Sequence, residues 1–197
     1  MGLDQYLTLR NKAANKRYEQ IIDYYNLPEK EQSKTKCPDY PTSCNIHGVK
    51  WKNIDHKTEP VEVELLYWRK ANQIHNWFVK HVQNNVDDCD YYIVSIDKLH
   101  ALYKTLNSIA EKVTLIEEDE DSFDIKFKEN ELEVKAFCES TLPTCDGFFF
   151  GSTDYDKYYF LNIIQTVKNL KRIFEYIDCN GIEDDSEDYA IYYHSSW

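Results

Sequence analysis

The sequence predicts a single α+β domain in which three or four helices pack on a small antiparallel sheet. The chain has 197 residues, a length that suits one domain with a sizeable core. Hydrophobic residues make up 42%, which indicates a folded rather than a disordered chain. Segments with helical periodicity are interspersed with short alternating segments, without an internal repeat or linker. We therefore expect one domain spanning residues 1–197.

The first third of the chain contains the less regular elements. Residues 3–9 are predicted to form a strand, and residues 13–26 a helix, because their apolar side chains recur at helical spacing. Residues 29–47 are polar and contain two prolines, so we expect a loop. Residues 48–54 and 61–66 are predicted strands, the second with clear alternation.

The middle of the chain has two predicted helices separated by a short strand. The first spans about 66–84, and the second spans about 96–112 with Ser95 as its N-cap. Residues 91–94 form the strand. The apolar stripe of the first helix consists of Tyr67, Ala71, Ile74, Phe78 and Val82.

The last part of the chain is predicted to contain an inserted β-hairpin, over 118–137, and a long helix. The two arms of the hairpin alternate within residues 122–137, around the turn KENE. Residues 147–150 are strand-like, the helix spans about 154–177 and ends at Asn180-Gly181, and 189–194 form a closing strand. The alternating residues are Phe123, Ile125 and Phe127 on one arm, and Leu132, Val134 and Ala136 on the other.

The stretch GFFFGSTDYDKYYF, residues 147–160, joins the predicted strand to the last helix. Thr153 and Asp156 have the spacing of a capping box, and a short strand over 148–150 would bury phenylalanine rings in the core. The alternative is a ligand site, since free N–H groups at a helix start attract anions. Asp154 and Asp156 oppose an anion and suit a hydroxyl, an amine or a metal ion. Ser152, Thr153 and Asp154 are then the residues expected to meet a ligand.

A second candidate site follows from one edge of the predicted helix over 66–84. Trp68, Asn72 and His75 recur at helical spacing beside the apolar stripe, and Arg69 borders them. These side chains can stack on and hydrogen-bond to a planar ligand. The alternative is that His75 is a boundary residue with a structural partner.

The C-terminal residues YYHSSW form a third candidate. An aromatic last residue after a strand pattern indicates a docked terminus rather than a frayed one. Trp197 is expected to plug a core edge, or to form a pocket wall with Tyr192, Ser195 and Ser196.

Charge and motifs narrow the classes of function. The net charge of −12 opposes binding to a nucleic-acid backbone, although an acidic mimic of DNA stays possible as an alternative. No apolar run approaches the ~20 residues of a membrane span, and the N-terminus does not resemble a signal peptide. We find no dinucleotide, P-loop or catalytic fingerprint, so we expect no cofactor.

Six cysteines are predicted to be reduced thiols in a cytosolic chain. Cys37 and Cys44 have six residues between them, with His47 close by, but zinc ligands are usually paired at shorter spacing. We expect small buried thiols instead of a metal site.

Several long sequence motifs of this chain occur together in one family. The chain opens with MGLDQYL, continues with YWRKANQIHNWFV and GFFFGSTDYD, and ends in SSW. In these words it resembles a family of uncharacterised proteins of tailed bacteriophages and prophages. The resemblance covers roughly half of the chain. It implies a phage protein made in the bacterial host cytoplasm, and it transfers no catalytic residue.

The expected function is that of a phage-encoded binding module rather than an enzyme. It would sequester a small nucleotide-like molecule or clamp a host protein, because Tyr, Trp and Arg dominate binding surfaces. We expect neither a direct nucleic-acid partner nor a membrane partner. Alternatives are a metal-assisted hydrolase or transferase, with His75 as base and Asp154 or Asp156 on the metal, an acidic DNA mimic, or a virion component.

Overall fold

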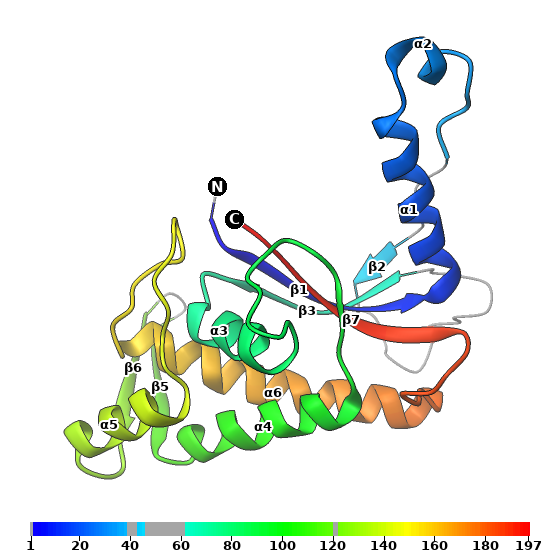
Figure 1. Ribbon diagram of the computed structural model, residues 1–197. Coiled ribbons are helices and arrows are strands. Elements are labelled where there is room, and N and C mark those ends of the chain that lie inside the picture. Colours follow the sequence, from blue (N-terminus) through cyan, green and yellow to red (C-terminus); the bar gives the residue numbers. More distant parts are fainter. Residues whose placement is uncertain (1, 39–42, 46–61, 120–121) are drawn as a thin grey trace.

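The computed structural model describes residues 2–38, 43–45, 62–119 and 122–197 of the chain. Its centre is a five-stranded sheet with the order β2-β3-β1-β7-β4 (Figure 1). A second sheet has two strands, β5 and β6. The predicted α+β class is confirmed.

The central strand of the large sheet is β1 (Asp4–Asn11), at the very start of the chain. It pairs antiparallel with β3 (Glu62–Arg69) on one side and with β7 (Tyr189–Ser196), at the end of the chain, on the other. The two termini therefore lie side by side (Figure 1). The edge strands are β2 (Ser43–Asn45), parallel to β3, and β4 (Tyr92–Ile93), antiparallel to β7.

Three helices, α3 (Asn72–His81), α4 (Ile96–Ala110) and α6 (Lys157–Asn180), cover one face of this sheet (Figure 1). Alternate sheet residues such as Leu7, Val63 and Tyr193 pack with the apolar stripes of these helices in one core. In the part of the chain that the structure describes, no helix combines the length and apolar character needed to cross a bilayer.

The remaining elements form two peripheral units. Helix α1 (Lys12–Asn26) stands away from the body and leads to the short α2 (Glu29–Gln32) at its tip (Figure 1). The second unit is the hairpin of β5 (Val113–Asp119) and β6 (Ser122–Phe127), followed by α5 (Glu131–Thr141). The expected strand over 48–54 lies outside the described residues. The expected uninterrupted loop over 29–47 is wrong, because that range contains α2 and β2.

The helix predicted to start at residue 66 starts later in the structure, because β3 continues to Arg69 and α3 begins at Asn72. Ladder pairing with β1 extends β3 as far as Arg69, which lies opposite Asp4. Tyr67 is therefore an exposed strand residue rather than part of a buried helical stripe. Lys70, with φ 57°, turns the chain, and α3 begins two residues later. The apolar spacing alone fits a helix, but hydrogen bonds to the neighbouring strand extend β3 instead.

The hairpin predicted over 118–137 is also wrong in its second arm. Strand β6 pairs with the strand that precedes it, β5, and not with the segment that follows it. That following segment, which contains Leu132, Val134 and Ala136, belongs to α5. The side chain of Asn130 accepts hydrogen bonds from the backbone N–H groups of Leu132 and Glu133, which caps this helix. Val134 and Cys138, one helical turn apart, are its buried residues.

The three consecutive phenylalanines form a tight turn, not the predicted core strand. Phe150 is buried, but Phe148 and Phe149 are 78% and 50% exposed. Phe149 has φ 66°, a left-handed conformation that is uncommon for a bulky residue. The backbone N–H of Phe150 donates to the carbonyl of Gly147 and closes the turn.

The predicted caps are confirmed at two helix ends and corrected at a third. Ser95 accepts from the N–H of Lys98 at the start of α4, and Gly181, with φ 59°, ends α6. At the start of α6 the N-cap is Asp156 instead of Thr153, because the Asp156 carboxylate accepts from the N–H groups of Tyr158 and Tyr159.

Asp156→Ala should lower the free energy of unfolding by about 1 kcal/mol, because two helix N–H groups lose their acceptor. Thr153→Ala should change it by less than about 0.5 kcal/mol, and Asp156→Ser should retain most of it. Urea denaturation followed by circular dichroism measures all three. A larger loss in Thr153→Ala than in Asp156→Ala would contradict this assignment of the cap.

Candidate functional site

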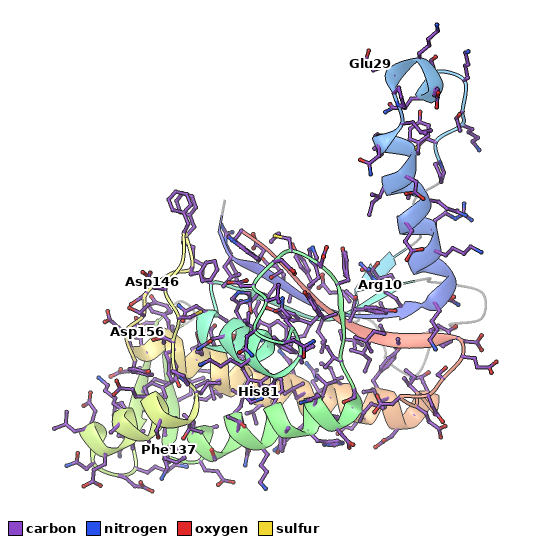
Figure 2. All side chains as sticks on the ribbon, in the orientation of Figure 1. Arg10, Glu29, His81, Phe137, Asp146 and Asp156 are labelled. Atoms are coloured by element: carbon purple, nitrogen blue, oxygen red, sulfur yellow. The ribbon has the colours of Figure 1, made fainter. Side chains whose placement is uncertain are left out.

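A pocket of about 390 Å³ opens where the end of β3, the start of α3 and the start of α6 meet. We call it the loop pocket, because the loop between α5 and α6 forms one of its walls. Figure 2 labels Asp156 at this wall. The pocket is lined by Arg69, Lys70, Gln73, Gly151, Ser152, Asp154, Asp156, Tyr158, Tyr159 and Asn162.

Two unusual backbone conformations bring the pocket walls together. Lys70 has φ 57° and Gly151 has φ 97°, and the two residues lie against each other. A Cβ at Gly151 would lie 3.1 Å from the Cβ of Lys70, so both the conformation and the close approach require glycine. Such conformations persist where the surrounding structure holds them, and they are common at binding sites.

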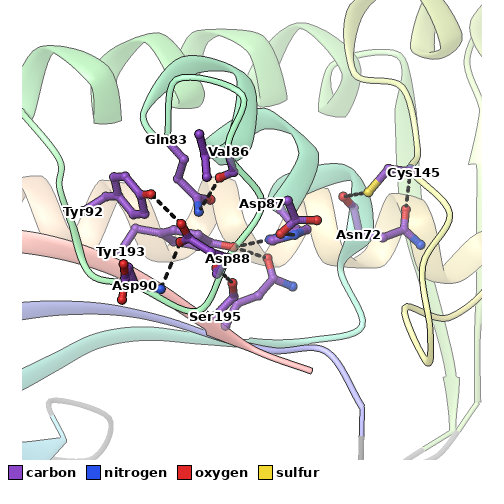
Figure 3. Close-up of polar contacts among 12 residues, drawn as sticks. Asn72, Gln83, Val86, Asp87, Asp88, Asp90, Tyr92, Cys145, Tyr193 and Ser195 are labelled. Carbon is purple, nitrogen blue, oxygen red and sulfur yellow. Dashed lines mark hydrogen bonds and ion pairs between the residues drawn. The ribbon is translucent and has the colours of Figure 1, made fainter. Parts of the chain in front are cut away.

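The side-chain amide of Asn72, the first residue of α3, fixes the loop. Its Nδ2 donates to the carbonyls of Ser152 at 2.8 Å and of Phe150 at 3.3 Å. Its Oδ1 accepts from the backbone N–H of Cys145, and the Cys145 thiol donates to the Asn72 carbonyl (Figure 3). Asn72 thus holds both legs of the loop against α3.

The pocket carries charges of both signs on different walls. Arg69 and Lys70 are exposed at the end of β3. In the loop wall, the Ser152 hydroxyl donates to the carboxylate of Asp154 and accepts from the Asp154 N–H, which orients that carboxylate. Asp156 is engaged in capping α6. The arrangement suits a ligand with an anionic group at one end and hydrogen-bond donors at the other.

Aromatic and amide groups complete the pocket. Gln73 is buried, and its Nε2 donates to the carbonyl of Tyr159. The ring of Tyr158 is 58% exposed and meets Phe123 edge to face at 5.4 Å. An exposed ring fixed by a second ring is a surface on which a planar group can stack.

His75 lies in the interior, outside the loop pocket. Its Nε2–H donates to Asp87 at 3.0 Å, and its Nδ1 lies 2.8 Å from the hydroxyl of Tyr193. A carboxylate only accepts, so Nε2 carries a proton, and the Tyr193 hydroxyl near Nδ1 also donates to Oε1 of Gln5 at 3.2 Å. Burial lowers the pKa of His75 below its usual 6.5, an effect that Asp87 opposes only in part. Figure 3 labels these two partners, Asp87 and Tyr193.

The structure separates the residues that the sequence grouped on one helix edge. Trp68 belongs to β3, is buried, and donates from Nε1 to the hydroxyl of Thr166 at 2.8 Å, so its predicted exposure to a ligand is wrong. Asn72 and His75 are buried as well. Only Arg69 of this group lines the loop pocket.

The C-terminal candidates also lie apart from the loop pocket. Tyr192 and Ser195 are buried in β7. The Trp197 ring packs 5.7 Å from the His75 ring and 5.9 Å from the Phe150 ring, as a docked terminus should. Of the other predicted residues, Ser152 and Asp154 line the loop pocket, whereas Thr153 is exposed beside it and accepts from Thr144 through its carbonyl.

Gln73, Tyr158 and Asn162 line the pocket but were not among the predicted site residues. Gln73 is a polar residue between apolar helix positions, which is a weak signal for a functional role. Tyr158 and Asn162 are four residues apart, so they share one face at the start of α6. Recognising that face required the position of the true N-cap.

The cysteines only partly follow the expectation of small buried thiols. Cys138 is buried, and burial raises its pKa to about 11. Cys89 and Cys179 are exposed, so the expectation is wrong for them. The side chains of Cys44 and His47 lie outside the described part of the chain. Within that part, no three His, Cys, Asp or Glu side chains gather as a metal ion would need.

Comparison with known proteins finds no matching family model, no similar curated protein and no similar solved structure.

Asn72→Ala should lower the free energy of unfolding by about 2–4 kcal/mol, because two carbonyls and one N–H lose their partner. Asn76→Ala is the matched control, since Asn76 donates to a single carbonyl, that of Pro143, and should cost about 1 kcal/mol. Chemical denaturation of both variants measures the difference. Equal losses would contradict the role of Asn72 in holding the loop.

The free energy of unfolding should fall as the pH is lowered from 7.5 to 5.5. Below 6.5 the unfolded chain binds a proton at His75 that the folded chain takes up only at lower pH, so acid favours unfolding. Burial also lowers the pKa values of His81 and His194, which act in the same direction.

His75→Gln should therefore lose less stability than the wild type over this pH interval, whatever its stability at pH 7.5. Urea denaturation of both proteins at the two pH values measures this difference. A steeper loss in His75→Gln would show that His75 is protonated more readily in the folded state than in the unfolded state.

Proposed function

We propose that this chain binds a small nucleotide-like molecule in the loop pocket and sequesters it unchanged. The observation that carries the proposal is the arrangement of that pocket. Two cationic side chains, Arg69 and Lys70, border one wall, and the oriented carboxylate of Asp154 and the exposed ring of Tyr158 lie on others.

The cationic wall suits a phosphate. Arg69 offers a planar guanidinium that can bind two phosphate oxygens, and Lys70 offers a point charge. A chain with a net charge of −12 repels anions at long range, so an anionic ligand needs such a local cluster. Gln73, which also lines the pocket, adds a side-chain amide that is held in place by burial and by its hydrogen bond to Tyr159.

The lining residues from the loop and from α6 suit the remainder of a nucleotide. A carboxylate accepts hydrogen bonds from a ribose hydroxyl or a base amine, and Asp154 is positioned to do so by Ser152. Tyr158 provides a face for a planar base. One pocket therefore combines all three kinds of contact that a nucleotide makes.

The position of His75 supports sequestration over the hydrolase alternative. The hydrolase alternative requires His75 to act as a base near Asp154 or Asp156. Both nitrogens of His75 are engaged inside the protein, and His75 does not line the pocket that contains the two aspartates. The structure gives that alternative no support.

The resemblance to phage proteins supports a role inside an infected bacterium. The stretch YWRKANQIHNWFV supplies Arg69, Lys70 and Gln73, and GFFFGSTDYD supplies the loop wall. Two of the motifs that carry the resemblance thus contribute residues to the loop pocket. In this proposal the protein acts in the bacterial host cytoplasm, where it removes a nucleotide-like signal of the host.

A second candidate function, clamping a host protein, is favoured by the turn over 147–150. The rings of Phe148 and Phe149 lie 4.2 Å apart and project from the loop that Asn72 fixes. Exposed aromatic residues on a rigid support are typical anchors of protein interfaces.

Addition of a bound nucleotide at 100 times its Kd should stabilise the protein by about 2.7 kcal/mol, which corresponds to a rise in Tm of roughly 5–10 °C. A thermal-shift screen of linear and cyclic nucleotides and NAD derivatives measures this, and chromatography of each mixture shows whether the ligand is intact. Arg69→Gln combined with Lys70→Gln should abolish the shift.

Lys168→Gln combined with Arg172→Gln is the charge-matched control for this double variant, because both residues are exposed on the same helix as Tyr158 but lie outside the pocket lining. It should retain the full shift. Consumption of the nucleotide would contradict sequestration, and the absence of any shift would contradict the nucleotide proposal and favour a protein partner.

A further inference from the structure

A second pocket, of about 340 Å³, lies on the other face of the large sheet. Leu7 and Leu9 of β1 point into the core with the helices, so Thr8 and Arg10 point to the opposite face. We call this the sheet pocket. Its lining includes Tyr6, Thr8, Arg10, Glu62, Tyr91 and His194.

The floor of the sheet pocket is fixed by contacts within the protein. Arg10 is 3% exposed, its Nε lies 3.1 Å from the carboxylate of Glu62, and its guanidinium lies 3.8 Å above the ring of Tyr91. The Tyr91 ring in turn stacks on His194 at 4.2 Å. A ligand would thus meet a surface whose side chains are already in place.

One polar atom of this floor points to a ligand. The residue Thr8 is 4% exposed, and its hydroxyl has no hydrogen-bond partner among the described residues. Buried hydroxyl groups are nearly always hydrogen-bonded, since an unmade bond is unfavourable. A residue such as Val would fit the same strand position without this disadvantage.

The charges of the lining exclude strongly ionic ligands. The carboxylates of Glu62 and Glu64 and the net charge of −12 oppose an anion. The buried guanidinium of Arg10 opposes a cation at the floor. Burial and Arg10 lower the pKa of His194, so its ring is neutral at pH 7.

The remaining chemistry matches a molecule with many hydroxyl groups. Thr8, Ser196 and the tyrosines offer groups that both donate and accept, as sugar hydroxyls do, and the carboxylates accept. The ring of Tyr6, which is only partly buried, offers an apolar surface to the C–H face of a sugar. We propose that the sheet pocket is a binding site for an uncharged saccharide, separate from the loop pocket.

The test combines binding and stability in one pair of variants. Neutral mono- and disaccharides, namely glucose, galactose, mannose, N-acetylglucosamine and sucrose, are screened against the full chain by saturation-transfer difference NMR. The sugar with the strongest signal is then titrated. Thr8→Val should weaken its binding roughly three- to tenfold, as the loss of one hydrogen bond does, and should raise Tm.

Thr166→Val is the matched control for Thr8→Val. Thr166 is equally buried, but its hydroxyl accepts from Trp68 and donates to the carbonyl of Asn162. Thr166→Val should therefore lower Tm and leave saccharide binding unchanged. The Arg69→Gln, Lys70→Gln variant should also bind the saccharide normally, which separates this proposal from the nucleotide site.

Three results would overturn the proposal. The first is that no saccharide of the panel gives a saturation-transfer signal. The second is that Thr8→Val binds the saccharide as tightly as the wild type does. The third is that Thr8→Val lowers Tm. The last result would mean that the hydroxyl serves the fold instead of a ligand.

Discussion

The side-chain amide of Asn72 is the contact on which the loop pocket and the aromatic turn both depend. It joins the first residue of α3 to Cys145, Phe150 and Ser152, and so connects the end of β3 to the loop that leads into α6. A side chain with two donors and one acceptor is needed, because two carbonyls and an N–H converge on it. Leucine fills a similar volume and aspartate has a similar shape, but neither can donate to the two carbonyls.

The stretch from 67 to 79 divides its residues between the interior and the pocket. Trp68 and His75 make hydrogen bonds inside the protein, to Thr166 and to Asp87 and Tyr193, while Arg69 and Lys70 remain exposed. Buried polar contacts of this kind fix the orientation of the elements they join, because alternative packings would leave the groups unpaired. The cations of the pocket are therefore positioned by neighbours that never meet a ligand. A site built this way needs little rearrangement on binding.

The long helices were predictable from sequence, whereas the short helix α5 and the junctions between elements were not. The repeat of apolar residues in α4 and α6 extends over several turns and identifies a helix by itself. Tyr67 fits a helical stripe equally well, yet pairing of β3 with β1 decides its conformation. In α5 a short alternation suggests a strand, whereas the Asn130 cap and the burial of Val134 and Cys138 establish a helix. Arg69, Ser152 and Asp154 were predicted for the site, but Gln73 and Asn162 meet them only through tertiary contacts.

The central claim is that a nucleotide-like ligand binds between the β3–α3 turn and the start of α6. Hydrogen–deuterium exchange of the full chain, with and without the nucleotide that gives the largest rise in Tm, tests it most directly. The account predicts slower exchange in residues 69–73 and 150–162, and unchanged exchange in α4 and α5, which do not line the pocket. Protection confined to other segments, or absent at a saturating nucleotide concentration, would contradict it.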